Sequence, residues 1–434
     1  MRTMETKYLI IGNSAGGIGA AEAIREVDRE GSLTIVSDEP YPAYSRPLIS
    51  KYLSRERHLD TMLYRPADFY TRNNITPLLG KEVKQLRLDS HTAELEDGQV
   101  FLWEKLLLAT GGMPIFPRIP GSDKRGVFTF ATLGDAKAID EVLDKANRAV
   151  VIGGGLIGVS LTQALKKRGV AVTLVEMKER ILNTVLDEQG SLMAEETIGR
   201  AGVDIVTGHT VTEIVGKGKV VGAVLDDGKE IRCNLVVVAI GVSPRLGLAQ
   251  GVKIKVNRGI VVDRYMTTSH ADVFCCGDAA EAYDFVYGTN RVIPIWPGAY
   301  IGGRVAGYNM AGKKTEYQGG TAMNSLNYFG LDIASAGMVI PPEGDGCEVL
   351  SRRDSAGYRK VVLRDDRLVG MIFVGNIEKS GMVFGLMRDQ VNVKGFRQVL
   401  LADDFGLALL PREIWRERLE TPPSGSTLEL SRHG

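Results

Sequence analysis

Two glycine-rich turns carry the strongest chemical signal in the sequence. The first lies in YLIIGNSAGGIGAAE (residues 8–22), where Gly12, Ser14 and Gly17 follow an apolar strand and open a helix. A turn of this kind directs backbone N–H groups and a helix N-terminus at a phosphate. Because Ser14 replaces the second glycine of the usual G-x-G-x-x-G pattern, this turn alone is a weak indication of a dinucleotide site.

The second turn has the complete pattern. AVVIGGGLIGVSL (residues 149–161) places G-x-G-x-x-G, from Gly153 to Gly158, between an apolar strand and a helix. The strand that follows ends in Glu176, at the spacing where a carboxylate accepts hydrogen bonds from a ribose. This carboxylate would repel a 2′-phosphate, which favours NADH over NADPH, although two basic residues shortly after it keep NADPH open.

Acidic and small residues follow other predicted strands. The strand after the first turn ends in Asp38 and Glu39, of which Asp38 is the better candidate for a ribose. Two apolar strands run into small residues at 109–111 and at Gly241, where backbone can approach a ligand closely. A further apolar strand delivers Gly277-Asp278, whose carboxylate either caps a helix or binds a polyol.

The elements that must position these residues repeat along the chain. A glycine turn, a strand with an acidic end, a hairpin, an apolar strand and a small-residue turn occur in this order twice. Residues 114–146 are proline-rich and then helical, which indicates a domain boundary. In the C-terminal part, strands are predicted at 326–338, 358–363 and 368–374 and a short helix at 381–388. This part therefore reads as a separate antiparallel α+β domain.

Composition and charge narrow the classes of partner. The 434 residues include 53 basic and 53 acidic side chains, so no net charge recruits nucleic acid or an anionic membrane. We find no apolar run long enough to span a bilayer and no signal-peptide pattern. The four cysteines lack C-x-x-C spacing and the five histidines are scattered. We therefore expect no metal site and a reducing, cytoplasmic location.

In this order the motifs resemble the pyridine-nucleotide disulfide oxidoreductase superfamily, and within it the flavin subunits of rubredoxin, ferredoxin and nitrite reductases. YSRPLISKYL (44–53) is similar to their Y-x-R-P-x-L-S-K loop, and WEKLLLATGGMP (103–114) and VFCCGDAA (273–280) are similar to two further FAD-contacting turns. LRDDRLVGMIFVG (363–375) is similar to part of their C-terminal domain. The resemblance implies an α/β fold with two Rossmann-like domains, the NAD domain inserted in the FAD domain, and a C-terminal α+β domain.

The resemblance also implies boundaries and site residues. An FAD-binding domain is expected at 1–117 and 246–320, an NAD(H)-binding domain at 118–245, and a C-terminal interface or acceptor-side domain at 321–434. The residues expected to hold FAD are Gly12, Ser14, Ala15, Gly16, Gly17, Asp38, Glu39, Ser45, Arg46, Lys51, Val83, Ala109, Thr110, Gly111, Gly277, Asp278, Trp296 and Ala299. The residues expected to hold NAD are Gly153, Gly155, Leu156, Ile157, Gly158, Glu176 and Gly241.

Three residues depart from the family pattern. Ser14 replaces a glycine, although its hydroxyl can itself donate to a phosphate. Ser160 stands where many relatives carry a glutamate that pairs with the loop lysine, so Lys51, the candidate catalytic residue, lacks this partner. Ile115 occupies the place of a common arginine.

Thiol chemistry is not expected. The loop at 41–53 contains no cysteine, whereas disulfide reductases and single-cysteine oxidases need a reactive thiol there. What remains is hydride transfer between nicotinamide C4 and flavin N5, followed by electron transfer to a separate carrier, because the sequence holds no metal-centre motif.

The resemblance thus implies an FAD-dependent enzyme that links NAD(H) to an iron–sulfur protein, in either direction. Relatives of this type also occur as NAD-coupling flavin subunits of larger anaerobic complexes, such as phenylglyoxylate or tungsten aldehyde oxidoreductases, and beside carbon monoxide dehydrogenases. Two alternatives stay open: an NADH oxidase or quinone reductase with a small-molecule acceptor, and a non-catalytic flavoprotein that serves as a binding module. A homodimer or hetero-oligomer through the C-terminal domain is expected.

Overall fold

The computed structural model describes residues 3–403, 405–406, 409–412 and 414 of the chain. The chain divides into two units, residues 1–184 with 191–323 and residues 185–190 with 324–434. Among the described residues, no helix is long and apolar enough to cross a bilayer. The end of the predicted C-terminal domain lies outside the described residues.

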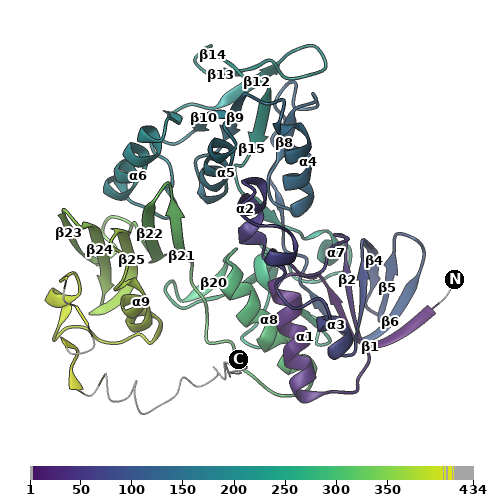
Figure 1. Cartoon of the computed structure of the whole chain (residues 1–434). Helices are drawn as coiled ribbons and strands as arrows, with labels where there is room; N and C mark the ends of the chain where they lie inside the picture. Colours follow the sequence, from purple (N-terminus) through teal and green to yellow (C-terminus); the bar gives the residue numbers. More distant parts are fainter. Residues whose placement is uncertain (1–2, 404, 407–408, 413, 415–434) are drawn as a thin grey trace, which may run out of the picture. The chain divides into compact units, whose positions relative to one another are not determined.

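The first unit contains a sheet whose central strand leads into the first glycine turn (Figure 1). Its parallel strands, in sheet order, are β3 (Ile75–Leu79), β2 (Leu33–Ser37), β1 (Thr3–Ile11), β6 (Val100–Leu108) and β18 (Val273–Cys275). Parallel strands of this kind are covered on both faces and need continuous apolar runs. Leu9, Ile10 and Leu107 meet this requirement, since none of them is exposed.

Strand β6 pairs with different neighbours along its length. Its first half pairs antiparallel with β5 (Thr92–Leu95), which pairs in turn with β4 (Val83–Arg87). Its second half pairs with β18, which follows in the sequence only after a long insertion between the two strands. The Gly277 motif is thereby placed beside the turn that follows β6.

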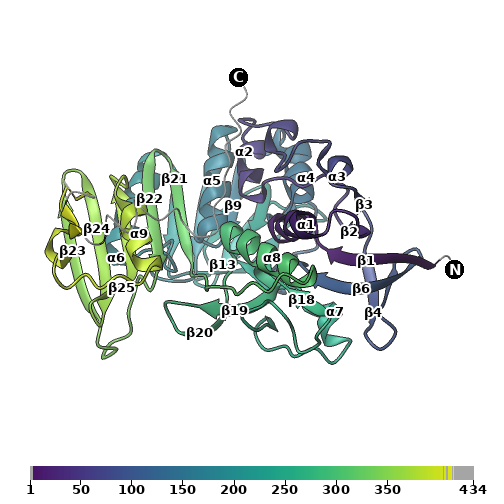
Figure 2. The ribbon, with the colours of Figure 1, turned by 90° about the horizontal axis from the view of Figure 1, so that it is seen from below.

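Two helices of this unit are in backbone contact with each other. Figure 2 shows α1 (Ala15–Val27) and α8 (Trp296–Met310) side by side. A Cβ atom on Gly303 would lie 2.1 Å from the carbonyl oxygen of Gly16, and one on Gly307 would meet the next turn of α1 equally closely. Glycine at these positions is what lets α8 approach the N-terminus of α1.

The insertion forms a second parallel sheet in the same unit. Its strands, in sheet order, are β11 (Asp204–Thr207), β10 (Ala171–Glu176), β9 (Arg148–Ile152), β15 (Leu235–Val238) and β8 (Val127–Thr129). Its helices are α4 (Leu133–Leu143), α5 (Leu156–Lys167) and α6 (Glu188–Arg200). The predicted order, one dinucleotide-binding unit inserted into another, is confirmed.

Smaller elements complete the first unit. The antiparallel pieces are β7 (Gly112–Pro114) with β16 (Val242–Pro244), β12 (Val211–Val215) with β13 (Gly222–Leu225) and β14 (Glu230–Arg232), and β19 (Ala280–Asp284) with β20 (Thr289–Val292); β17 (Ile260–Val261) pairs parallel with β19. The short helices are α2 (Ile49–Leu53), α3 (Phe69–Arg72) and α7 (Gly247–Gln250), with 3₁₀ turns at Arg46–Leu48, Asp60–Met62 and Gly277–Ala279. Asp278 therefore lies in a 3₁₀ turn before β19 and does not cap a long helix.

The second unit is a five-stranded sheet with a helix. In sheet order its elements are β21 (Met323–Tyr328), β22 (Leu331–Gly337), β25 (Arg367–Gly375), β24 (Gly357–Arg364) and β23 (Glu348–Asp354), followed along the chain by α9 (Ser380–Arg388) and a 3₁₀ turn at Arg397–Val399. Asp365 and Asp366, both with positive φ, form the turn between β24 and β25. The predicted α+β character of this part is confirmed.

One prediction for the second unit was wrong in detail, and one strand was missed. The strand expected at 326–338 is two strands, separated by Phe329 and Gly330, both of which have positive φ. The sequence also gave no sign of β23, because its residues are mostly exposed and show no alternation of apolar and polar side chains.

Candidate functional site

The first glycine turn brings three chain segments into contact. Gly12 has φ +122°, and a Cβ atom there would lie 2.1 Å from the carbonyl oxygen of Ala109. A Cβ atom on Gly17 would lie 1.9 Å from the carbonyl oxygen of Gly12. A Cβ atom on Gly16 would lie 2.7 Å from the Cys276 sulfur and 3.4 Å from the carbonyl oxygen of Ala299. The predicted residues of the first, second and third FAD turns therefore lie together.

Two polar side chains at this site, those of Ser14 and Asp278, make no hydrogen bond within the described part of the chain. Ser14 is the N-cap of α1, which begins at the buried Ala15, and its hydroxyl makes no capping bond. The half-buried carboxylate of Asp278 makes no hydrogen bond, and burial raises its pKa while the charge of Arg46 opposes the rise. A pyrophosphate at the helix N-terminus and a polyol hydroxyl at Asp278 would satisfy these groups. The residues present thus fit FAD.

The turn after β6 is tied to the chain that returns from the insertion. The Ala109 N–H donates to the carbonyl of Ile11 at 2.8 Å. The Thr110 hydroxyl donates to the carbonyl of Arg245 at 3.1 Å, and the Arg245 N–H donates to the carbonyl of Gly111 at 2.9 Å. The two small-residue turns are therefore held against each other, in line with the pairing of β7 and β16.

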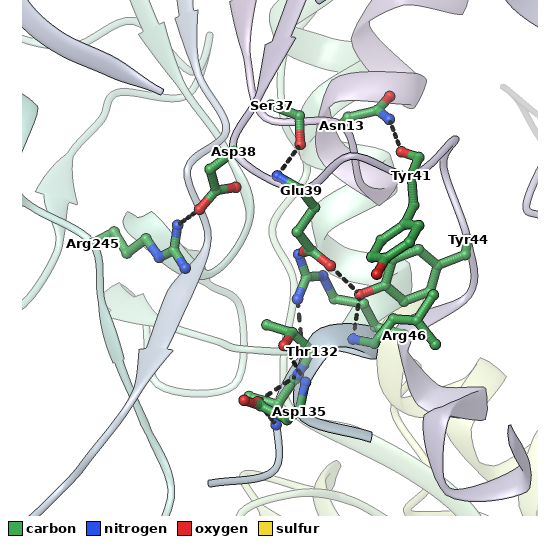
Figure 3. Close-up of polar contacts among 12 residues, drawn as sticks. Asn13, Ser37, Asp38, Glu39, Tyr41, Tyr44, Arg46, Thr132, Asp135 and Arg245 are labelled. Carbon is green, nitrogen blue, oxygen red and sulfur yellow. Dashed lines mark hydrogen bonds and ion pairs between the residues drawn. The ribbon is translucent and has the colours of Figure 1, made fainter. Parts of the chain in front are cut away.

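The two acidic residues after β2 point in different directions (Figure 3). Asp38 forms an ion pair with Arg245, at 2.6 Å between Oδ2 and Nη1. Glu39 forms an ion pair with Arg46 and accepts a hydrogen bond from the Tyr44 hydroxyl at 2.6 Å. Both carboxylates already have partners. To bind a ribose, as predicted, Asp38 must either release Arg245 or accept hydrogen bonds from the ribose and from Arg245 at the same time.

Lys51 has a carboxylate partner that the sequence did not reveal. Its Nζ lies 3.2 Å from Oε1 of Glu56, which also accepts from Nζ of Lys167 on α5 at 2.9 Å. Hydrogen bonds from the Ser54 hydroxyl and from Lys167 lower the pKa of Glu56 to about 2, so it is ionised. Glu56 is thus a charged partner for Lys51, a role that the serine at position 160 cannot fill.

Other predicted FAD residues take supporting positions. Trp296 starts α8 and packs edge-to-face on Tyr64, with ring centroids 5.0 Å apart. Ser45 precedes the 3₁₀ turn of the loop, where its N–H donates to the carbonyl of Met62 at 2.8 Å. Val83 is buried in the core of the sheet and pairs with Leu95 of β5, so its side chain does not face a ligand. Tyr64 is a candidate that gave no sequence signal.

The second glycine turn repeats the geometry of the first. Gly153 has φ +111°, and a Cβ atom on Gly158 would lie 1.8 Å from the carbonyl oxygen of Gly153. Gly155 caps α5, and a Cβ atom there would meet nothing within 4 Å. Leu156 and Ile157 form the first turn of α5, where their N–H groups are placed at the helix N-terminus. Strand, turn and helix therefore fit a pyrophosphate in the same way.

Glu176 is fixed at the second turn by backbone donors. Its Oε2 accepts from the Gly154 N–H at 2.7 Å, and its Oε1 accepts from the Lys178 N–H at 2.9 Å. A fixed carboxylate here fits a ribose diol and disfavours a 2′-phosphate. Gly241, with φ +119°, accepts from the Ile115 N–H at 3.0 Å and closes the far side of the turn.

Thiols and possible metal ligands lie elsewhere. Burial raises the pKa of the Cys276 thiol to about 12 and that of Cys275 well above its ordinary range, so neither is a thiolate. Among the described residues, His209, Asp226 and Asp227 gather ligand atoms within 4.8 Å of one another. The sequence placed His209 among scattered histidines, but in the structure its Nδ1 lies 2.8 Å from Oδ1 of Asp226, within hydrogen-bonding distance.

Comparison with known proteins agrees with this geometry. The family model described as pyridine nucleotide-disulphide oxidoreductase matches residues 6–321, and that of the rubredoxin NAD+ reductase C-terminal domain matches residues 323–391. The chain is 32% identical over 417 residues to the NADH-dependent phenylglyoxylate dehydrogenase subunit epsilon of Aromatoleum evansii, which covers 95% of this chain and 98% of that protein.

Two further relatives extend the likeness. NADH-rubredoxin oxidoreductase of Clostridium acetobutylicum is 26% identical over 372 residues, which cover 86% of this chain and 92% of that protein. A chain of the crystallised covalent putidaredoxin reductase–putidaredoxin complex is 26% identical with a TM-score of 0.82, covering 89% of this chain and 94% of its own length. The chain therefore belongs to the pyridine nucleotide-disulphide oxidoreductase family and ends in a domain of the rubredoxin NAD+ reductase type.

Proposed function

We propose that the chain is an FAD-dependent NAD(P)H oxidoreductase that moves electrons between NAD(H) and an iron–sulfur protein. The observation that carries the proposal is the presence, in one unit, of two strand–turn–helix sites with the glycine contacts that a pyrophosphate needs. FAD, when bound, exchanges a hydride with nicotinamide and single electrons with a one-electron carrier. Family membership supports an oxidoreductase, and the names of the relatives support this pair of substrates.

The chain's own residues divide the work between the two sites. Ser14 and the N-terminus of α1 bind the FAD pyrophosphate, and Asp278 accepts a hydrogen bond from its polyol. The second glycine turn and Glu176 bind NAD(H), with NADH preferred because the carboxylate is held in place by two backbone donors. Lys51, paired with Glu56, is the candidate for electrostatic orientation of the flavin end. The boundaries 1–117, 118–245, 246–320 and 321–434 are part of this proposal.

We further propose that the iron–sulfur partner belongs to a larger redox complex in the cytoplasm. The full-length likeness to a phenylglyoxylate dehydrogenase subunit supports an NAD-coupling role. The four cysteines are free, which supports a reducing compartment. A thiol-dependent oxidase is disfavoured, because the loop beside the FAD turn has no cysteine and the two buried thiols next to Gly277 are protonated.

Anaerobic spectroscopy of the purified protein tests the function. We expect a flavin spectrum that bleaches with NADH, faster than with NADPH, and transfer of the electrons to an added ferredoxin or rubredoxin. Gly158→Ala should abolish bleaching by NADH but not by dithionite, because its Cβ would lie 1.8 Å from the carbonyl oxygen of Gly153. Gly199→Ala, on the exposed side of α6 with nothing within 4 Å, is the matched control. A holoprotein that neither nucleotide bleaches would contradict the proposal.

A further inference from the structure

The hydroxyl of Tyr44 joins two segments that the proposed function assigns to different cofactors. It donates to Oε2 of Glu39 at 2.6 Å and accepts from the N–H of Leu133 at 3.0 Å. Tyr44 belongs to the loop after β2, in the FAD-binding segment, and Leu133 is the first residue of α4, in the NAD(H)-binding segment. The side chain is only 5% exposed, so water does not compete for either bond.

The N-terminus of α4 is incomplete without this tyrosine. Thr132 and Asp135 form a capping box, in which the Thr132 hydroxyl accepts from the Asp135 N–H and the Asp135 carboxylate accepts from the Thr132 N–H. The box leaves the N–H of Leu133 unsatisfied, and the Tyr44 hydroxyl supplies its acceptor. Figure 3 shows Tyr44 beside the capping residues Thr132 and Asp135. Arg46 adds a second bond, from Nη1 to the carbonyl of Ala131 at 3.3 Å.

The other end of the same loop is fixed to the first glycine turn. Nδ2 of Asn13 donates to the carbonyl of Tyr41 at 3.2 Å. The Tyr70 hydroxyl donates to Oδ1 of Asn13 and accepts from the N–H of Ala43, both at 2.9 Å. A continuous run of hydrogen bonds therefore leads from the turn proposed to hold FAD, through the loop, to α4. Along the chain, α4 leads directly into β9 and the second glycine turn.

We propose that Tyr44 is a positioning residue for hydride transfer: its hydroxyl fixes α4 on the FAD-binding loop and so sets the separation of the two dinucleotide sites. The inference rests on the proposed function. Hydride transfer needs the reacting atoms within a narrow range of distance, and a displacement of about 1 Å can slow such a step about 100-fold. Arg46, through the carbonyl of Ala131, and the Lys167–Glu56 ion pair also join the two segments, but the Tyr44 hydroxyl is the acceptor for the first N–H of α4 and therefore fixes the start of this helix.

Stopped-flow reduction by NADH is the test. Tyr44→Phe keeps the ring but removes both hydrogen bonds, and we expect its limiting rate of flavin bleaching at saturating NADH to fall at least 10-fold. FAD content, the midpoint of thermal unfolding and bleaching by dithionite should stay within error of the wild type. Tyr41→Phe is the matched control, because its ring packs edge-to-face on Tyr44 at 6.4 Å while its hydroxyl makes no hydrogen bond within the described residues. We expect its rate to change less than twofold.

Residue-resolved hydrogen exchange tests the same contact in the wild-type protein. The Leu133 amide should exchange more slowly than that of Gly134, the next residue of α4, and Tyr44→Phe should remove the difference. A wild-type limiting rate in Tyr44→Phe, a loss of FAD from it, or equal exchange at the two amides would each overturn the positioning role. Failure of NADH to bleach the wild-type holoprotein would overturn the proposed function and this inference with it. A wild-type rate in Tyr44→Phe, with normal bleaching of the wild-type protein, would overturn the inference alone.

Discussion

The contact between α1 and α8 predicts a large effect from a single methyl group. In Gly303→Ala the new Cβ would lie 2.1 Å from the Gly16 carbonyl oxygen, whereas ordinary van der Waals contact begins at 3.4 Å. The two helix backbones would have to separate by about 1 Å, which close-packed cores resist. Alanine is favoured over glycine in a helix by about 1 kcal/mol, but overpacking costs about 1–3 kcal/mol, so the balance is unfavourable.

The same displacement should weaken the proposed FAD site, because Gly16 lies in the first turn of α1. We expect the dissociation constant of FAD to rise about tenfold, which corresponds to about 1.4 kcal/mol. Titration of apoprotein with FAD, followed by flavin fluorescence, measures the constant, and thermal unfolding measures the stability. Gly199→Ala, with open space around its Cβ, should leave FAD binding unchanged and stability equal or slightly raised. If Gly303→Ala behaves like Gly199→Ala, the argument from backbone contact is refuted.

Three further changes have expected outcomes. Ser14→Gly should raise the FAD dissociation constant about fivefold, which corresponds to a phosphate contact of about 1 kcal/mol, measured by the same titration. Asp38→Asn should raise the FAD dissociation constant about tenfold if Asp38 binds the ribose. Arg245→Gln, which breaks the same ion pair, should change that constant less than twofold. Asp187→Asn should destabilise the second unit by about 3 kcal/mol in urea unfolding, because it leaves the buried Lys360 unpaired. Burial acts to raise the pKa of Asp187, but hydrogen bonds from Tyr358 and Lys360 of β24 outweigh it, so the pKa is lowered. The ionised carboxylate therefore contributes its full stabilisation above about pH 4, and this stabilisation declines as the pH falls through the lowered pKa.

Each of these predictions has a result that would contradict it. An unchanged FAD constant in Ser14→Gly would show that the hydroxyl contributes nothing. Equal effects of Asp38→Asn and Arg245→Gln would assign Asp38 to the ion pair alone. A stability difference between Asp187→Asn and wild type that does not shrink on acidification would exclude the ionised carboxylate as its source. Asp68→Asn, in an exposed ion pair with Arg72 on the first unit, should change stability by less than about 0.5 kcal/mol and serves as control.

Much of the fold was predictable because its signals are local. Strand–turn–helix units require glycine where φ is positive or where backbones touch, and Gly12, Gly153 and Gly158 meet these requirements within a few residues of their strands. The strands on either side of Asp365-Asp366 were predictable from their apolar residues, and the turn between them has two aspartates with positive φ, a conformation that aspartate tolerates better than most residues. The strand β23 was not, since a mostly exposed strand leaves no apolar alternation in the sequence.

The sequence by itself determined the two glycine turns, their order and the family, since backbone geometry at a turn constrains the residues adjacent in the chain. Only the tertiary structure decided the partners of the charged and hydroxyl groups. Tyr44 and Leu133 are 89 residues apart, and Asp38 and Arg245 are 207 residues apart, so no spacing in the sequence connects either pair. The physical reason is that a hydrogen bond needs its two atoms within about 3 Å, and packing of whole helices and strands sets that distance.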